Sequence, residues 1–155
     1  MTGVILATVG GLGALLFSAV IKIFFASAVE YFAARSIGKL WRRGQYDVRG
    51  TWKSVYDYHS GGRKLTAEQL MNFAQIGNTI YGHNIGGRSK HKHKMKLTLD
   101  GHFITGTWRN TAPGAGHHGV AQFRIRAQGN EMNGQWVGFD GDSNIQSGPW
   151  RMVRQ

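Results

Sequence analysis

Residues 92–110, KHKMKLTLDGHFITGTWRN, decide the fold of this chain. The first half of the stretch alternates between apolar and basic side chains, with Met95, Leu97 and Leu99 in one phase and Lys92, Lys94 and Lys96 in the other. Alternation with a period of two predicts a strand with one buried face. Asp100-Gly101 is a strong signal for a two-residue hairpin turn. The stretch therefore predicts an antiparallel hairpin with strands at 92–99 and 102–110.

The same alternation continues on both sides of this hairpin. Turn signals at Gly77-Asn78 and Gly129-Asn130 separate further alternating runs. Together the runs predict eight strands, at 48–58, 67–76, 79–86, 92–99, 102–110, 119–128, 131–139 and 147–154. Short strands joined by local turns form an antiparallel sheet, and closing eight of them into a barrel removes the exposed edges. We therefore expect an eight-stranded antiparallel up-and-down β-barrel.

A tripeptide of the form Gly-x-Trp occurs in four of the predicted strands, at 50–52, 106–108, 134–136 and 148–150. A glycine lets a strand bend and leaves space for the large ring on the same face. Calycin-like barrels also contain Gly-x-Trp strands, and the chain resembles them in these tripeptides. The predicted lumen contains Trp52, Tyr56 and Trp108. Two interpretations stay open: simple core packing, or an aromatic cup that stacks a flat ligand.

The N-terminal stretch predicts a membrane anchor. Residues 2–21 carry no charged side chain, and four arginines or lysines follow within residues 35–43. About 20 mostly apolar residues suffice to cross a membrane as one helix, and the basic flank predicts a cytoplasmic β domain. We expect an α+β, single-pass inner-membrane protein, with a transmembrane helix and basic amphipathic extension at 1–43 and a cytosolic barrel at 44–155. A signal peptide is the alternative, because Ala26-Ser27-Ala28 resembles a cleavage site.

One row of the predicted helix has a small or charged side chain at every fourth residue: Gly10, Ala14, Ser18, Lys22, Ala26 and Glu30. Residues four apart are neighbours on a helix surface, and small residues at this spacing let helices pack closely in lipid. Lys22 has two interpretations. Either it snorkels to the membrane interface, or it lies on the inner face of a homo-oligomer, where a ring of lysines lines a pore and favours anions.

The charge of the chain favours anionic partners. The formal net charge is +11, which suits nucleotides, nucleic acids or lipid headgroups. Basic side chains gather in two places, with Arg88, Lys90, Lys92, Lys94 and Lys96 in one and Arg124 and Arg126 in the other. If the two surfaces converge, they can bind a nucleic acid backbone. The alternative is a solvated edge or a contact with anionic lipid.

The sequence contains no recognisable catalytic or metal-binding constellation. The absence of cysteine excludes disulfides, thiol catalysis and Cys-based zinc sites. His91 and His93 share a strand face, near His117 and His118 in the cluster of histidines, but no acidic or cysteine residue accompanies them. Asp140 and Asp142 lie in a glycine-rich loop and have the character of turn residues. We therefore expect no metal, no cofactor and no enzymatic activity.

The order of these features resembles the membrane-anchored β-barrel effectors of CBASS-type antiphage signalling. The resemblance rests on the apolar N-terminus and on residues 39–43 (KLWRR), 48–52 (VRGTW), 72–82 (NFAQIGNTIYG) and 106–108 (GTW). In that family a small cytosolic barrel senses a cyclic nucleotide, and the membrane part, usually two spans, then disrupts the inner membrane. A single predicted span is more similar to the channel subunits of Hailong-type defence, in which an oligonucleotide made by a partner nucleotidyltransferase holds the channel shut.

The resemblance implies a membrane effector of antiphage defence. Such an effector is an oligomeric ion channel whose opening is controlled by a nucleotide or short single-stranded nucleic acid, made by a partner nucleotidyltransferase and bound to the barrels. A second hypothesis is a membrane-tethered β-barrel that binds a ligand without channel activity. A third is an exported, cleaved calycin-like binder of a small hydrophobic ligand, which loss of residues 1–28 from the mature protein would indicate.

Overall fold

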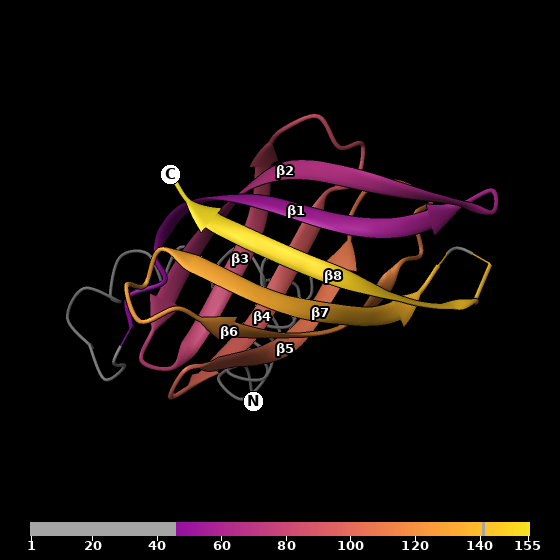
Figure 1. The fold of residues 1–155 in the computed structure, drawn as a ribbon. Coiled ribbons are helices and arrows are strands. Elements are labelled where there is room, and N and C mark those ends of the chain that lie inside the picture. Colours follow the sequence, from indigo (N-terminus) through magenta and orange to yellow (C-terminus); the bar gives the residue numbers. More distant parts are fainter. Residues whose placement is uncertain (1–45, 141) are drawn as a thin grey trace, which may run out of the picture.

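The computed structural model describes residues 46–140 and 142–155. In this part of the chain the regular elements are β1(Gly50–Ser60), β2(Arg63–Ile76), β3(Thr79–Gly86), β4(His93–Asp100), β5(Phe103–Asn110), β6(His118–Ile125), β7(Glu131–Phe139) and β8(Ile145–Arg154). Each strand pairs antiparallel with its neighbours in the chain, and β8 pairs with β1 (Figure 1). The predicted closed up-and-down barrel is confirmed. The largest difference in a strand boundary is the start of β2, at Arg63 instead of residue 67.

The apolar phase of the strands fills the lumen. In β4, Met95, Leu97 and Leu99 are buried, whereas Lys94 and Lys96 are exposed, as the alternation predicts. The strand β6 shows the same pattern. All four tryptophans of the described residues are buried. The core therefore runs inside the barrel, and the basic side chains of β4 and β6 lie on its outside.

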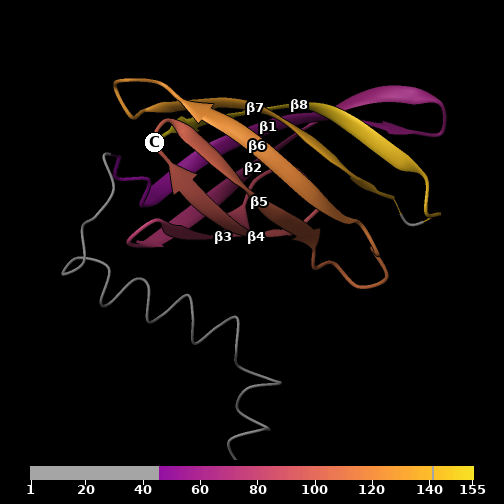
Figure 2. The same cartoon turned by 90° about the horizontal axis from the view of Figure 1, so that it is seen from below.

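The two ends of the barrel differ in the connections that cross them. The β2–β3, β4–β5 and β6–β7 turns lie at one end, which is also where the C-terminus of the described chain lies (Figure 2). We call this the closed end. The other four connections lie at the opposite end, which we call the mouth, and they include the two longest, at 87–92 and 111–117.

Residues 46–49, which precede β1, cross the closed end and seal it. Val48 is buried, and its N–H donates to Oε1 of Gln75 at 2.9 Å. The Nε2 of Gln75 donates to the backbone oxygens of Tyr46 and Gly77 at 3.2 and 2.9 Å, so this buried amide is fully bonded. The described chain thus enters the barrel at the end opposite the mouth.

Arg154, near the end of β8, fastens this seal from the strand that lies next to β1. Its guanidinium donates to the backbone oxygens of Arg49, at 2.6 Å, and of Asp47. The same group lies 4.7 Å from the centroid of the Trp52 ring, in a favourable cation–π contact. These bonds hold the first and last described segments together at the closed end.

The glycines of two Gly-x-Trp tripeptides allow neighbouring backbones to approach closely. A Cβ on Gly106 would lie 2.2 Å from a backbone oxygen of β4, and one on Gly134 would lie 1.9 Å from a backbone oxygen of β6. At Gly148 a Cβ would lie 2.6 Å from the backbone oxygen of Asp57 and 3.0 Å from Nε1 of Trp136, so both a backbone and an indole crowd this position. At Gly106 and Gly134 the physical reason is therefore the tight coiling of the barrel, not the tryptophan.

Substituting Gly134 by alanine tests this constraint. Gly134→Ala places a methyl group against the backbone of β6, and the free energy of unfolding should fall by about 1–3 kcal/mol, the usual effect of overpacking. Chemical denaturation of the full-length protein measures this change. Gln135→Ala, at the exposed neighbouring position, is the matched control and should change the free energy by less than about 0.5 kcal/mol. Equal effects of the two substitutions would contradict the close approach.

The expectations for the N-terminal stretch lie outside the described residues. They are the transmembrane helix and basic extension of residues 1–43 and the pore-lining row Gly10, Ala14, Ser18, Lys22 and Glu30. Within 46–140 and 142–155, no helix has the length and hydropathy that crossing a membrane requires.

Candidate functional site

The mouth is open because the seam that closes the barrel is short. β1 and β8 pair only from Trp52–Arg154 to Tyr56–Trp150, whereas β1 pairs with β2 as far as Ser60–Arg63. Beyond Tyr56 the β1–β2 and β7–β8 hairpins separate, and their tips lie apart at the right of Figure 1. The lumen is thus closed along the seam and open beyond it.

Two hydrogen bonds bridge the gap between the separated hairpins. The indole N–H of Trp136 donates to the backbone oxygen of Asp57 at 3.1 Å, and the N–H of His59 donates to Oε1 of Gln146 at 3.1 Å. The first bond lies deep in the mouth and the second at its rim. They hold the hairpins at a fixed separation while leaving the lumen accessible.

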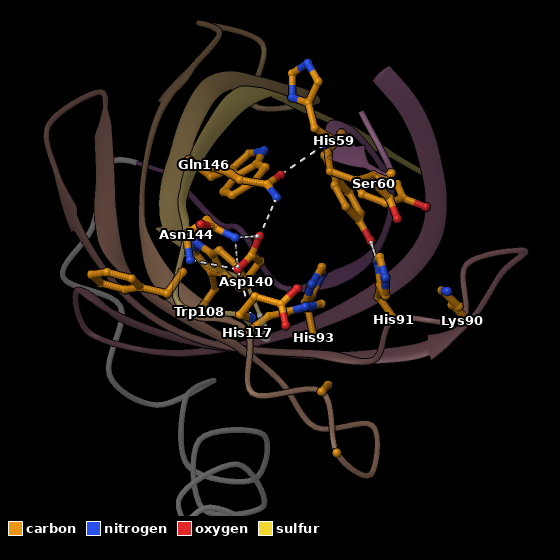
Figure 3. Close-up of a pocket in the computed structure, with 18 of the residues that line it drawn as sticks. His59, Ser60, Lys90, His91, His93, Trp108, His117, Asp140, Asn144 and Gln146 are labelled. Atoms are coloured by element: carbon orange, nitrogen blue, oxygen red, sulfur yellow. Dashed lines mark hydrogen bonds between the residues drawn. The ribbon is translucent and has the colours of Figure 1, made fainter. Parts of the chain in front are cut away.

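A cavity of about 660 Å³ fills the mouth, and Figure 3 looks into it. We call this cavity the cup. Its walls come from β1, β4, β5, β7 and β8, and from the connections that precede β2, β4, β6 and β8 at the mouth. Aromatic rings dominate the interior: Tyr56, Tyr58, Trp108, Trp136 and Trp150, together with His91, His93 and His117.

The three indoles in the wall of the cup present ring surfaces to it but have no free hydrogen-bond donor. Trp108 stands edge-on to Trp136 and Trp150, with ring centroids 5.4 and 6.0 Å apart, an arrangement that aromatic pairs favour. The N–H of each indole already donates to a protein oxygen, at 3.1 Å for Trp108, 3.1 Å for Trp136 and 2.7 Å for Trp150. These rings can therefore stack or pack against a ligand without donating hydrogen bonds to it.

Burial keeps the polar groups of the cup interior uncharged. The Tyr56 hydroxyl lies 2.8 Å from Nδ1 of His91, and Nε2 of Gln69 lies 2.7 Å from Nδ1 of His93. Burial, with smaller effects of His91 and His117, lowers the pKa of His93 from 6.5 to about 3. Burial also lowers the pKa of His91 and raises the pKa of the Tyr56 hydroxyl to about 12. At neutral pH none of these side chains carries a charge.

The rim of the cup carries charges of both signs, with Lys90 across the cup from Asp140 (Figure 3). The Asp140 carboxylate accepts the backbone N–H groups of Asp142 and Asn144 at 3.0 and 2.8 Å and Nε2 of Gln146 at 2.9 Å. These bonds, above all the one from the Asn144 backbone, lower the pKa of Asp140. The predicted turn role of Asp140 is confirmed, and the turn also positions Gln146 at the rim.

The structure separates the predicted aromatic binding residues into two groups. Tyr56 and Trp108 line the cup. Trp52 is fully buried near the closed end, where its N–H donates to the backbone oxygen of Val48 at 2.9 Å. Core packing therefore accounts for Trp52, whereas the other two rings belong both to the core and to the cup wall.

The two predicted basic surfaces do not converge. Lys94 and Lys96 are exposed on the outer face of β4, and Lys96 lies opposite Thr107 of β5. Arg124 lies on the outer face of β6, opposite Phe103 of β5. Positions 103 and 107 are four residues apart, which corresponds to roughly 13 Å along a strand. The two surfaces are therefore offset along the barrel as well as around it.

Most of the predicted basic run lies on the outside of the barrel and begins at the rim of the cup. Arg88, Lys90 and Lys92 are exposed on the connection between β3 and β4, and Lys90 lines the rim. Lys90, Lys92, Lys94 and Lys96 thus form a surface that we call the lysine strip. Arg126, which follows β6, forms an ion pair with Glu131 at 3.1 Å and lies apart from this strip.

Sequence reasoning missed the polar residues of the lumen. Ser54 and Gln69 are fully buried. The burial of Gln69 could have been predicted from its position between Ala67 and Met71, because all three residues have the inward-facing phase of β2. Gln146 reaches the rim from the start of β8, which begins at Ile145, two residues before the predicted start at 147.

Comparison with known proteins does not assign this chain to a family: no protein-family model matches it, and no curated protein matches it. In the described part of the chain, no three His, Asp or Glu side chains are grouped so that they could hold a metal ion. What the site can do chemically is therefore inferred from the cup itself, whose walls present aromatic rings.

The neutral, buried His93 makes the stability of the barrel depend on pH. Because its pKa is about 3 in the folded protein and 6.5 ordinarily, the unfolded chain binds a proton that the folded barrel does not. The stabilisation is complete above about pH 6.5 and is lost as the pH falls toward 3. Between pH 6 and 5 the free energy of unfolding should fall by about 1 kcal/mol, as urea denaturation would measure.

Two variants test whether His93 causes this pH dependence of the free energy of unfolding. His93→Phe removes the buried imidazole and should remove about 1 kcal/mol of the fall between pH 6 and 5, leaving the part that the lowered pKa of His91 contributes. His118→Phe removes an exposed imidazole from the outside of the barrel and should preserve the whole fall. An unchanged slope in His93→Phe would contradict a neutral His93.

Proposed function

We propose that this protein is a membrane effector of antiphage defence, in which the barrel senses a nucleotide and the N-terminal segment forms an oligomeric ion channel. The observation that supports the sensing role best is the aromatic cup. The membrane role rests on the uncharged stretch 2–21 and the basic flank within 35–43. The partners in this proposal are further copies of the chain, membrane lipid, and a nucleotidyltransferase that makes the ligand.

The cup suits a flat ligand with an anionic end. Base–aromatic stacking contributes about 1–3 kcal/mol per base, and five tyrosine and tryptophan rings line this cavity. Its volume of about 660 Å³ is within the usual range of small-molecule sites. Lys90 provides a positive charge at the rim for a phosphate. A purely hydrophobic ligand of the calycin kind would make no use of the positive charge of Lys90.

The lysine strip extends the site for a longer ligand. In the part of the chain that the structure describes, Lys90, Lys92 and Lys94 form no ion pair. A terminal base in the cup would allow the following phosphates to lie along the outer face of β4. Each phosphate contact releases counterions, so the affinity for an oligonucleotide should fall more steeply with salt than the affinity for a mononucleotide.

The ligand site and the N-terminal junction lie at opposite ends of the barrel. Residues 46–49 enter at the closed end and are held there by Gln75 and Arg154, so a ligand in the cup does not touch them. We therefore assign control of the channel to contacts between neighbouring barrels, which a ligand at the mouth can reach. Ligand binding then changes how the barrels associate and, through them, how the membrane segments pack.

Tyr58→Ala tests the sensing role with little damage to the core. The Tyr58 ring is only partly buried, and its centroid lies 5.0 Å from that of His91 in the cup. Loss of one stacking ring should weaken nucleotide binding about tenfold. Isothermal titration calorimetry of the full-length protein would measure this with adenosine 5′-monophosphate, uridine 5′-monophosphate, a cyclic dinucleotide and a short single-stranded oligonucleotide.

The matched control is Phe103→Ala, because this exposed ring lies on the outside of β5, away from the cup. It should leave the affinities unchanged. If the wild-type protein binds none of these ligands, the nucleotide-sensing role is wrong. If it binds only the oligonucleotide, with a steep salt dependence, the lysine strip is the main determinant.

Lys22→Ala tests the channel role. Reconstituted in planar bilayers, the wild-type protein should conduct and respond to the bound nucleotide. A ring of lysines favours anions, so the variant should have a lower anion preference or a changed conductance, with nucleotide affinity intact. If full-length protein binds nucleotide but never conducts, the membrane-tethered binding protein without channel activity is the correct alternative.

A further inference from the structure

A chain of buried amides fixes the position of the hydrogen on His93. Nδ2 of Asn84 donates to the backbone oxygen of Gly86 at 2.9 Å, which settles the orientation of this amide. The same nitrogen donates to Oε1 of Gln69 at 3.0 Å, so Gln69 presents its Nε2 to Nδ1 of His93, 2.7 Å away. An amide nitrogen only donates, so Nδ1 of His93 accepts and carries no hydrogen. The neutral imidazole therefore carries its hydrogen on Nε2.

The Nε2–H of His93 has no acceptor among the residues that the structure describes. The residue is 4% exposed and lines the cup (Figure 3). Its ring is surrounded by Tyr56, Trp108 and Trp150, with centroids 5.1, 5.3 and 5.3 Å away. The indole nitrogens only donate, and the Tyr56 hydroxyl is hydrogen-bonded to Ser89 and His91. A buried donor of this kind calls for an explanation, because nearly all buried polar groups in native proteins are paired.

We propose that His93 is a specificity-determining donor, and that the cup selects a flat heteroaromatic ring with a neutral acceptor, either a ring nitrogen or a ring carbonyl oxygen. This acceptor takes the hydrogen bond from Nε2–H of His93 while the ring packs against the indoles. The inference rests on the proposed function and deepens it. A nucleotide enters base-first, and its phosphates stay at the rim near Lys90.

The physical reason for this selectivity is the hydrogen bond that His93 would lose if a ring without a matching acceptor entered the cup. A ring without an acceptor covers Nε2–H and removes it from solvent without replacing the hydrogen bond. A ring that presents a donor at this point meets a second donor. Sites built to hydrogen-bond a ligand reject the isostere that lacks the bonding group much more strongly than apolar pockets reject a change in size.

Indole and benzimidazole test the proposal independently of any nucleotide. Both are flat bicyclic rings of similar size, and benzimidazole has a ring-nitrogen acceptor that indole lacks. At pH 8 the full-length protein should bind benzimidazole about ten- to a hundredfold more tightly than indole. His93→Phe keeps an aromatic ring and removes the donor, so this preference should disappear. Equal binding of the two rings to the wild-type protein would overturn the proposal.

The controls separate this inference from the proposed function. His118→Phe makes the same chemical change outside the cup and should retain the preference for benzimidazole. If neither adenosine nor uridine 5′-monophosphate, nor the cyclic dinucleotide, nor the oligonucleotide binds but the ring preference depends on His93, the nucleotide function fails and the donor role stands. If both monophosphates bind the wild-type protein and His93→Phe equally well, the donor role fails and the nucleotide function survives.

Nitrogen NMR of histidine-labelled wild-type protein gives the answer even if His93→Phe does not fold. Nδ1 of His93 should have the chemical shift of an unprotonated nitrogen and Nε2 that of a protonated one. Benzimidazole should move the Nε2–H proton resonance further downfield than indole does. A hydrogen found on Nδ1, or an Nε2–H resonance that does not respond to benzimidazole, would contradict the proposal.

Discussion

The short seam between β1 and β8 is the constraint on which the rest of this structure depends. Five residue pairs close the barrel, from Trp52–Arg154 to Tyr56–Trp150. Without them both strands would have an unpaired edge and the lumen would be exposed to solvent along its whole length. Where the pairing holds, side chains fill the lumen as a core. Where it ends, the hairpins separate and the same lumen becomes a cavity, so one feature of the register produces both the stable half and the accessible half.

The polar side chains of the lumen follow this division. In the closed half, Gln75 satisfies three backbone groups, and Ser54 accepts the indole N–H of Trp150 across the seam. In the open half, Gln69 links to His93, whose remaining donor faces the aromatic cluster of the cup. These polar side chains of the closed half are hydrogen-bonded within the protein, where the structure must be rigid. Within the part of the chain that the structure describes, a hydrogen-bond donor remains unpaired in the cup, where a ligand can use it, which is why the cup is a better candidate site than the closed end.

Alternation and turn chemistry sufficed to predict the barrel, because both are local properties of the sequence. They could not distinguish Trp52 from Trp108, since both belong to Gly-x-Trp tripeptides and both point inward. Which end of the lumen each occupies depends on the register of strands far apart in the chain. The phase of His93, shared with the apolar residues of β4, placed it inward. The position of its hydrogen depends on Gln69 and Asn84, which come from two other strands, and no local pattern contains that information.

The hydrogen bonds from Arg154 to the backbone of residues 47–49 can form only after β8 has been synthesised. The barrel of a nascent chain therefore closes last at this seam. The ribosome makes β1 early, and this strand keeps one bare edge until the ten residues of β8 have emerged. During that interval the incomplete sheet can pair with the edge of another chain, which is a route to aggregation. A nascent chain that stops before β8 would therefore be an open sheet with two unpaired edges, not a slightly smaller barrel, and pairing of β8 with β1 and β7 removes those edges.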